Sequence, residues 1–174
     1  MNHTLSSTIG IDTVIQSVQS ELYGLLDLRW EGTINGYGRV QKNKQVPQWY
    51  AGGSEYEPVY YNDNVSGNFF FIEGESHPTE DEVIFTSEVK VAFMVNLNQI
   101  QPLETGRADS KVQRDAVEFL RRISDERFTI TGLEKTVGKV FSGFDTSQIQ
   151  FEDYHPTHCF AVVLKLSYYI TDEC

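Results

Sequence analysis

The chain has 174 residues, of which 40% are hydrophobic. This length and composition predict one globular domain, residues 1–174, and exclude a wholly disordered chain. It holds 14 Lys and Arg against 25 Asp and Glu, a formal charge of -11. A surface this acidic repels phosphate, so we expect neither specific nucleic-acid binding nor docking on an anionic membrane.

The ends of the chain and its cysteines carry little further information. The first residues lack the basic and apolar regions of a signal peptide, and no apolar stretch is long enough to span a membrane. Two cysteines, Cys159 and Cys174, do not form the pattern of a disulfide framework. We expect reduced thiols, with a bridge between subunits through Cys174 as the alternative.

The first half of the chain changes character near residue 29. Apolar residues recur at spacings of three and four over residues 11–26, which predicts an amphipathic helix. Over residues 29–82, glycines and prolines separate short aromatic or β-branched runs, so this aromatic, glycine-rich insertion is predicted to form short strands and loops. The strands are expected at residues 37–40, 48–50, 59–61 and 68–72, and the acidic run 73–82 as a solvated loop.

The second half has longer elements. Residues 83–97 and 159–171 alternate between two faces, which predicts two long strands. Residues 109–123 carry one apolar helical face. Thr131 and Glu134 fit a capping box, which predicts a short helix over residues 132–141. Residues 148–158 are polar, with room for a further strand around Ile149 and Phe151.

This order predicts an α+β fold, a mostly antiparallel sheet with helices packed on one face. The other face of the two long strands is too apolar to be exposed, since it holds Ala92, Met94, Ala161 and Val163. We expect it to be covered by the aromatic insertion or by a neighbouring subunit.

Candidate chemistry is sparse. His155, His158 and Cys159 lie close enough in sequence for a metal site or a cryptic catalytic site, but zinc needs three or four ligands in fixed geometry and no second cluster accompanies them. An acidic group lacks the spacing of a calcium loop; it comprises Glu73, Glu75, Glu80, Asp81 and Glu82. We therefore expect no metal, no cofactor and no catalytic residue. An enzyme with a site around the two histidines and Cys159 remains a third hypothesis.

Aromatic residues are denser in the insertion than a small sheet needs. Tyrosine and tryptophan are enriched at interfaces, although such rings also pack cores and stack on sugars. The predicted interface residues are Tyr37, Trp49, Tyr50, Tyr56, Tyr60, Tyr61, Met94 and Tyr169.

The order of elements resembles a family, the tail terminator (tail-completion) proteins of long-tailed bacteriophages. The matching parts are the helix 11–26, the alternating strand 82–95, the helix 109–123, a short segment ending in Gly143-Phe144-Asp145, an acidic stretch, and the strand 159–171 with its tyrosine-containing, acidic end. The insertion 29–82 departs from it, because it is longer than in short members.

The resemblance implies a structural, non-enzymatic subunit of a phage or prophage tail. It implies a homo-oligomeric ring, a hexamer in that family, which caps the tail tube protein and joins the head-tail connector protein. The protein would then lie in the virion tail after assembly in the cytoplasm of the bacterial host. The charge of -11 per subunit would line the ring so that DNA passes without adhering. The alternative is a small binding domain that recognises a glycan or a peptide through the Tyr- and Trp-rich insertion.

Overall fold

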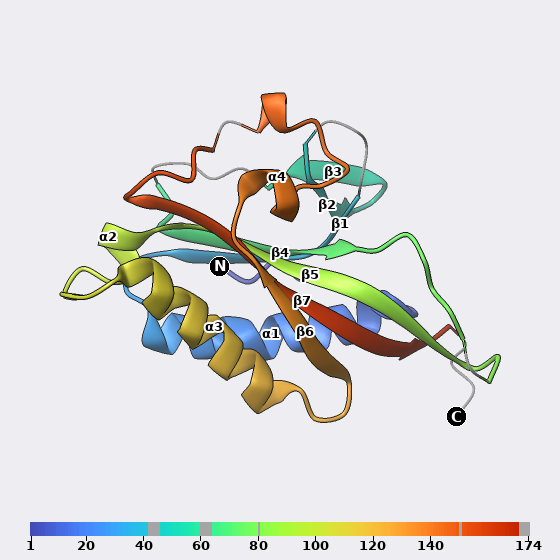
Figure 1. Ribbon diagram of the computed structural model, residues 1–174. Coiled ribbons are helices and arrows are strands. Elements are labelled where there is room, and N and C mark those ends of the chain that lie inside the picture. Colours follow the sequence, from blue (N-terminus) through green and yellow to red (C-terminus); the bar gives the residue numbers. More distant parts are fainter. Residues whose placement is uncertain (42–45, 60–63, 80, 150, 171–174) are drawn as a thin grey trace.

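The protein forms a single seven-stranded sheet of order β3-β2-β1-β4-β5-β7-β6. The computed structural model describes residues 1–41, 46–59, 64–79, 81–149 and 151–170. Two long helices, α1 and α3, lie along one face of the sheet, and the short helix α4 lies over the other (Figure 1). The expected α+β architecture is confirmed, because every pair of neighbouring strands is antiparallel except β1 and β4.

The two long helices follow the apolar periodicity of the sequence. Helix α1 (Ile11–Arg29) extends past the predicted end at residue 26, and α3 (Ala108–Ile123) begins one position early. Each buries one apolar stripe against the sheet, as the spacing predicts. The buried apolar residues are Ile11, Ile15, Val18, Leu22 and Leu26 of α1 and Val112, Ala116, Leu120 and Ile123 of α3.

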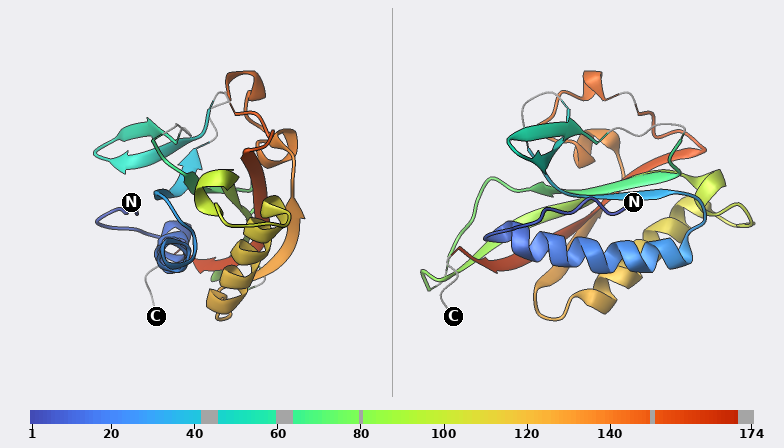
Figure 2. Two further views of the ribbon diagram at one scale, coloured as in Figure 1. Left: turned by 90° about the vertical axis from the view of Figure 1, so that its left-hand side faces the viewer. Right: turned by 180° about the vertical axis from the view of Figure 1, so that it is seen from behind.

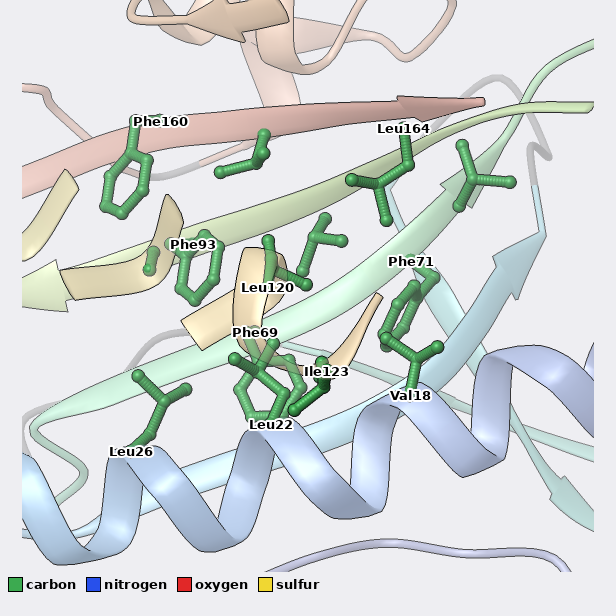
Figure 3. Packing of buried hydrophobic residues seen from close by; sticks show 14 of the residues in the cluster. Val18, Leu22, Leu26, Phe69, Phe71, Phe93, Leu120, Ile123, Phe160 and Leu164 are labelled. Carbon is green, nitrogen blue, oxygen red and sulfur yellow. The ribbon is translucent and has the colours of Figure 1, made fainter. Parts of the chain in front are cut away.

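The two long strands are neighbours in the sheet, between β4 and the edge strand β6. Strands β5 (Ile84–Asn96) and β7 (Thr157–Tyr169) pair antiparallel along their whole length. Their first face meets α1 and α3, and here Phe93 stacks on Phe160 with ring centroids 4.7 Å apart. Figure 3 shows these rings beside the leucines of α1 and α3. Both predicted long strands are thus confirmed. A one-turn helix, α2 (Leu97–Ile100), follows β5.

The region predicted as an insertion supplies four strands of the same sheet. They are β1 (Ile34–Gln41), β2 (Gln48–Gly52), β3 (Glu55–Pro58) and β4 (Gly67–Glu73). Gly52 and Gly53 adopt positive φ and turn the chain back at once, so that β3 ends at Pro58 and Val59, the one described residue of the strand predicted at 59–61, lies outside it. Tyr60 and Tyr61 lie outside the described residues.

The helix predicted over residues 132–141 is wrong. Residues Phe128–Glu134 form the edge strand β6, paired with β7, and only Val137–Val140 form a helix, α4. The capping-box pattern is overridden because β6 places Phe128 opposite Leu166 and Ile130 opposite Leu164. Gly132, a poor helix former, lies just after a bulge in this pairing.

The second face of the sheet is covered by the chain itself, chiefly by residues 137–149 and by Phe151. Figure 2 shows this segment above the sheet, opposite α1 and α3. The expectation that the insertion or a neighbouring subunit covers this face is therefore corrected: the insertion contributes only a part, through Val40, Trp49 and Val59. No strand forms at Ile149 or Phe151, and the 3-10 turn η1 (Thr146–Gln148) precedes them. Phe151 packs into the buried apolar cluster on this face, the second core, which also contains Phe70, Ala92, Met94, Phe141, Phe144 and Cys159.

Candidate functional site

Aromatic rings from distant parts of the chain gather beside the β2–β3 hairpin. His3 stacks on Tyr37, with ring centroids 4.4 Å apart and planes 8° apart, and meets the edge of Trp49 at 5.5 Å. The ring centroids of Tyr50 and Tyr56 lie 5.2 Å apart across the hairpin. The N-terminal segment thus completes the cluster. The sequence carries no signal for this role of His3, because a backbone bridge between Asn2 and Gly36 brings it to β1.

Among the residues that the structure describes, the predicted interface residues differ widely in exposure and position. Trp49 and Met94 are only 6% and 5% exposed and pack in the second core. Tyr37 and Tyr50 are half-buried. Tyr56, on the outermost strand β3, is 45% exposed, and Tyr169, at the end of β7, is 54% exposed. Of the described members of the set, only Tyr56 and Tyr169 present a large exposed ring, and they belong to different parts of the sheet. Tyr60 and Tyr61 lie outside the described residues.

A pocket of about 390 Å³ lies between this hairpin and α1, and a chain of charged groups forms one wall. The Arg39 guanidinium donates to Asp12 Oδ2 at 2.8 Å and also to Glu73. Burial on its own lowers the pKa of Arg39, but the two carboxylates outweigh it and raise this pKa. Beyond Glu73, the ring nitrogen Nε2 of His77 lies 3.2 Å from the carboxylate, and Nδ1 lies 2.8 Å from Tyr168 Oη.

The acidic run 73–82 is only partly the solvated loop that its composition predicts. Glu73 belongs to β4 and is half-buried against Arg39, whereas Glu75, Asp81 and Glu82 are exposed and Glu80 lies outside the described residues. Asp81 accepts hydrogen bonds from the backbone N–H groups of Val83 and Ile84 and so shapes the turn into β5. Within the described ranges, no group of three or more His, Cys, Asp or Glu side chains is placed to hold a metal ion.

His155 and His158 both line one polar depression, whereas Cys159 lies apart from it. His155 is exposed, and Cys159 is buried in the second core, where desolvation raises the pKa of its thiol far above the ordinary value. A thiol held protonated in this way is a poor nucleophile. His158 instead lies between Asp153 and Gln113. The buried Cys159 thiol therefore does not join the two histidines in one site.

His158 joins the loop before β7 to helix α3. Its Nδ1 lies 2.9 Å from Asp153 Oδ1, and its Nε2 lies 2.9 Å from the amide nitrogen of Gln113. Since an amide nitrogen only donates, Nε2 accepts from Gln113 and the other ring nitrogen, Nδ1, faces Asp153. The sequence places Asp153 and Gln113 too far apart to mark them as partners of one histidine.

A polar depression of about 800 Å³ surrounds this histidine, between the start of α3 and the loop before β7. At its rim, Arg107 donates two hydrogen bonds to the Asp109 carboxylate. This contact holds the pKa of Asp109 at about 2, well below its usual range. This ion pair joins the N-cap residue Arg107 to the first turn of α3.

Both outer strands of the sheet, β3 and β6, leave an edge without a neighbouring strand in the described chain. A third surface lies at the end of the long strands, where Ile84 pairs with Tyr169 and the Tyr169 carbonyl approaches Gly10. Exposed apolar side chains surround this end; they are Ile9, Val83, Tyr169 and Ile170. Exposed apolar groups gathered in this way are typical of protein contact surfaces.

Comparison with protein-family models and with curated protein sequences finds no match for this chain. Of the helices in the described part of the chain, none combines the length and the apolar character needed to cross a membrane.

Proposed function

We propose that this protein is a tail terminator, a structural subunit of the tail of a long-tailed bacteriophage or prophage. In this proposal, copies of the chain form a ring, a hexamer, that caps the tail tube and joins it to the head-tail connector. The ring assembles in the cytoplasm of the bacterial host and remains in the virion tail. No catalytic residue is assigned.

The observation that carries the proposal is the packing order of the elements. Strands β5 and β7 pair along their full length, α1 and α3 cover one face of that pair, and β7 closes the chain beside β5. This is the order of helix, long strand, helix and last strand on which the resemblance to tail terminators rests. The long strand pair supplies a rigid platform for repeated contacts between copies.

A closed ring also needs two different contact surfaces on each subunit, because its contacts run head to tail. The sheet offers two edges, β3 at one side and β6 at the other. Tyr56 is exposed on β3 and Leu133 on β6. We place the contacts between subunits at these two edges. A charge of -11 per subunit then sums around the ring and repels the DNA that passes through it.

Electron microscopy of the protein mixed with assembling tail tubes tests the proposal. We expect rings at one end of each tube and an arrest of tube growth. Leu133→Arg should abolish ring formation, since it places a charge at the β6 edge. Leu28→Arg is the matched control, because Leu28 is exposed on α1, away from both edges. Tubes that grow unchanged in the presence of the wild-type protein would contradict the tail-terminator role.

A further inference from the structure

The outward side of helix α3 is basic, although the chain as a whole carries a formal charge of -11. Four cations recur at the spacing of one helical face and form what we call the basic stripe; they are Lys111, Arg114, Arg121 and Arg122. Lys111 is half-buried and the three arginines are exposed. Two acidic residues of the helix do not balance this stripe, because Asp109 is paired with Arg107 and Asp115 is almost fully buried.

The cations of the basic stripe are weakly satisfied within the subunit. Lys111, Arg121 and Arg122 form no ion pair with any residue that the structure describes. Arg114 approaches the Asp115 carboxylate at 3.8 Å, and the Oδ1 atom that it faces accepts no hydrogen bond within the described chain. An exposed row of cations without partners attracts a surface of opposite charge.

Such a surface lies on the opposite side of the same molecule. The edge strand β3 exposes Glu55 and Glu57, and neither forms an ion pair with a residue in the described ranges. They are the only charged residues in the hairpin segment 46–59, so its charge is uniformly negative. The left view of Figure 2 shows the β2–β3 hairpin on one side of the molecule and α3 on the other.

We propose that the basic stripe of α3 binds the Glu55 and Glu57 edge of a second copy of this chain. The two surfaces carry opposite charges and lie on opposite sides of one subunit, so the same contact repeats from each copy to the next. Helix α3 packs beside β6, and the charge contact therefore adjoins the β6 edge. This inference rests on the proposed ring, for which it names the groups that join neighbouring subunits.

A nucleic acid fits the basic stripe less well than an acidic protein surface does. Glu118 lies within the stripe, and Asp125 and Glu126 follow the end of the helix, all three exposed. These carboxylates repel the continuous row of phosphates in DNA or RNA, as does the charge of -11. Two separate carboxylates on a short strand avoid that repulsion.

Sedimentation velocity of the isolated protein at low and high salt tests the contact. We expect self-association at low salt that weakens as added salt screens the charges. Lys111→Glu with Arg121→Glu in one variant, and Glu55→Lys with Glu57→Lys in another, should each weaken association about tenfold, because attraction becomes repulsion. An equimolar mixture of the two variants should associate again, since each presents the charge that the other lacks. Recovery in the mixture also shows that both variants are folded.

Lys139→Glu with Lys165→Glu is the matched control, because it reverses as much charge at exposed positions of α4 and β7 on the second face, away from α3. The contact is refuted if the wild-type protein is monomeric at low salt, if either charge reversal leaves association unchanged, or if the mixture does not associate. Binding of double-stranded DNA in place of self-association would also refute it.

The contact and the tail-terminator role fail in different ways. Self-association that passes these tests without capping of tail tubes would contradict the terminator role alone. Capped tubes whose rings form equally well from either charge-reversed variant would contradict the charge contact alone.

Discussion

The two faces of the sheet are covered in different ways, although the same strands supply both. On the first face, α1 and α3, of 19 and 16 residues, satisfy their own backbone hydrogen bonds and bury continuous apolar stripes. On the second face, the cover is a four-residue helix, a three-residue 3-10 turn and the loops between them. A cover of short elements opens at a lower free energy than one of long helices. We therefore expect stability to be graded across the sheet.

The largest difference is expected between two phenylalanine truncations. Phe93→Ala on the first face removes a fully buried ring stacked on Phe160 and should lower the free energy of unfolding by about 3–5 kcal/mol. Phe144→Ala on the second face removes a ring that is 8% exposed and lies in a loop, so the loss should fall at the low end of that range, about 3 kcal/mol. Urea denaturation followed by circular dichroism measures both. Equal losses would contradict the graded stability.

A second prediction concerns the stability of the first face, where α3 buries a carboxylate. Asp115 of α3 is almost fully buried, and its Oδ2 accepts from Trp30 Nε1 at 3.2 Å and from Gln101 Nε2 at 3.3 Å. Asp115→Ala leaves the Trp30 donor buried and unpaired, so the free energy of unfolding should fall by about 1–3 kcal/mol. Asp27→Ala, which removes an exposed carboxylate of α1, is the control. If both variants lose the same amount in urea, the paired carboxylate has no special role.

The grading also explains which parts of the fold could be predicted. The long helices and strands follow one period over many residues, so residues 11–26, 83–97, 109–123 and 159–171 were identified with small errors at their ends. The prediction of a helix over residues 132–141 failed because the local sequence pattern there is short and contradictory. Thr131 and Glu134 resemble a helix start, while pairing with β7 makes residues 128–134 a strand. Only tertiary contact decides between the two.

The candidate sites were less predictable than the fold, because each joins residues distant in sequence. The density of aromatic residues in the insertion indicated a special region, yet the sequence could not show that Trp49 is buried or that His3 stacks on Tyr37. In the sequence, Gln19 is one more polar residue of α1. The environment of its unpaired side-chain oxygen depends on β1, β2 and the N-terminal segment together, and no local pattern predicts that combination.

Lys90 of β5 bonds the sheet to the segment that covers its second face, the second cover. The Lys90 ammonium lies 2.7 Å from the Glu134 carboxylate, an ion pair without hydrogen-bond alignment, and it donates to the Lys139 carbonyl at 2.9 Å and to Ser142 Oγ at 3.2 Å. Lys90→Met should cost about 1 kcal/mol. It should also speed thiol labelling of Cys159, which the second cover buries.

The labelling experiment uses a Cys174→Ser background, so that Cys159 is the only thiol. Lys165→Met is the matched control, because Lys165 is exposed on β7 and its loss should not open the second cover. If Lys90→Met leaves the labelling rate at the control value, this lysine does not hold the cover in place.

The smallest expected effect is on stability at low pH, and it is tested with one carboxylate in each of the two covers. The pKa of Asp109, at the start of α3, is held at about 2 chiefly by the hydrogen bonds from Arg107, against about 3.9 in an unfolded chain. The folded state therefore binds fewer protons, and this contribution is complete above about pH 4 and is lost as the pH falls toward 2. Because the pair is near the surface, solvent screening limits it to less than about 1 kcal/mol.

Asp145 is the counterpart in the second cover. Its carboxylate accepts from the hydroxyl and the backbone N–H of Ser147, and these contacts lower its pKa. Asp109→Asn should flatten the fall in global stability between pH 4 and pH 2, because α3 unfolds with the whole sheet. Asp145→Asn should leave the global curve unchanged and alter only amide exchange near residues 146–148, because this cover opens by itself. A matching change in global stability for both variants would mean that the two covers unfold as one unit.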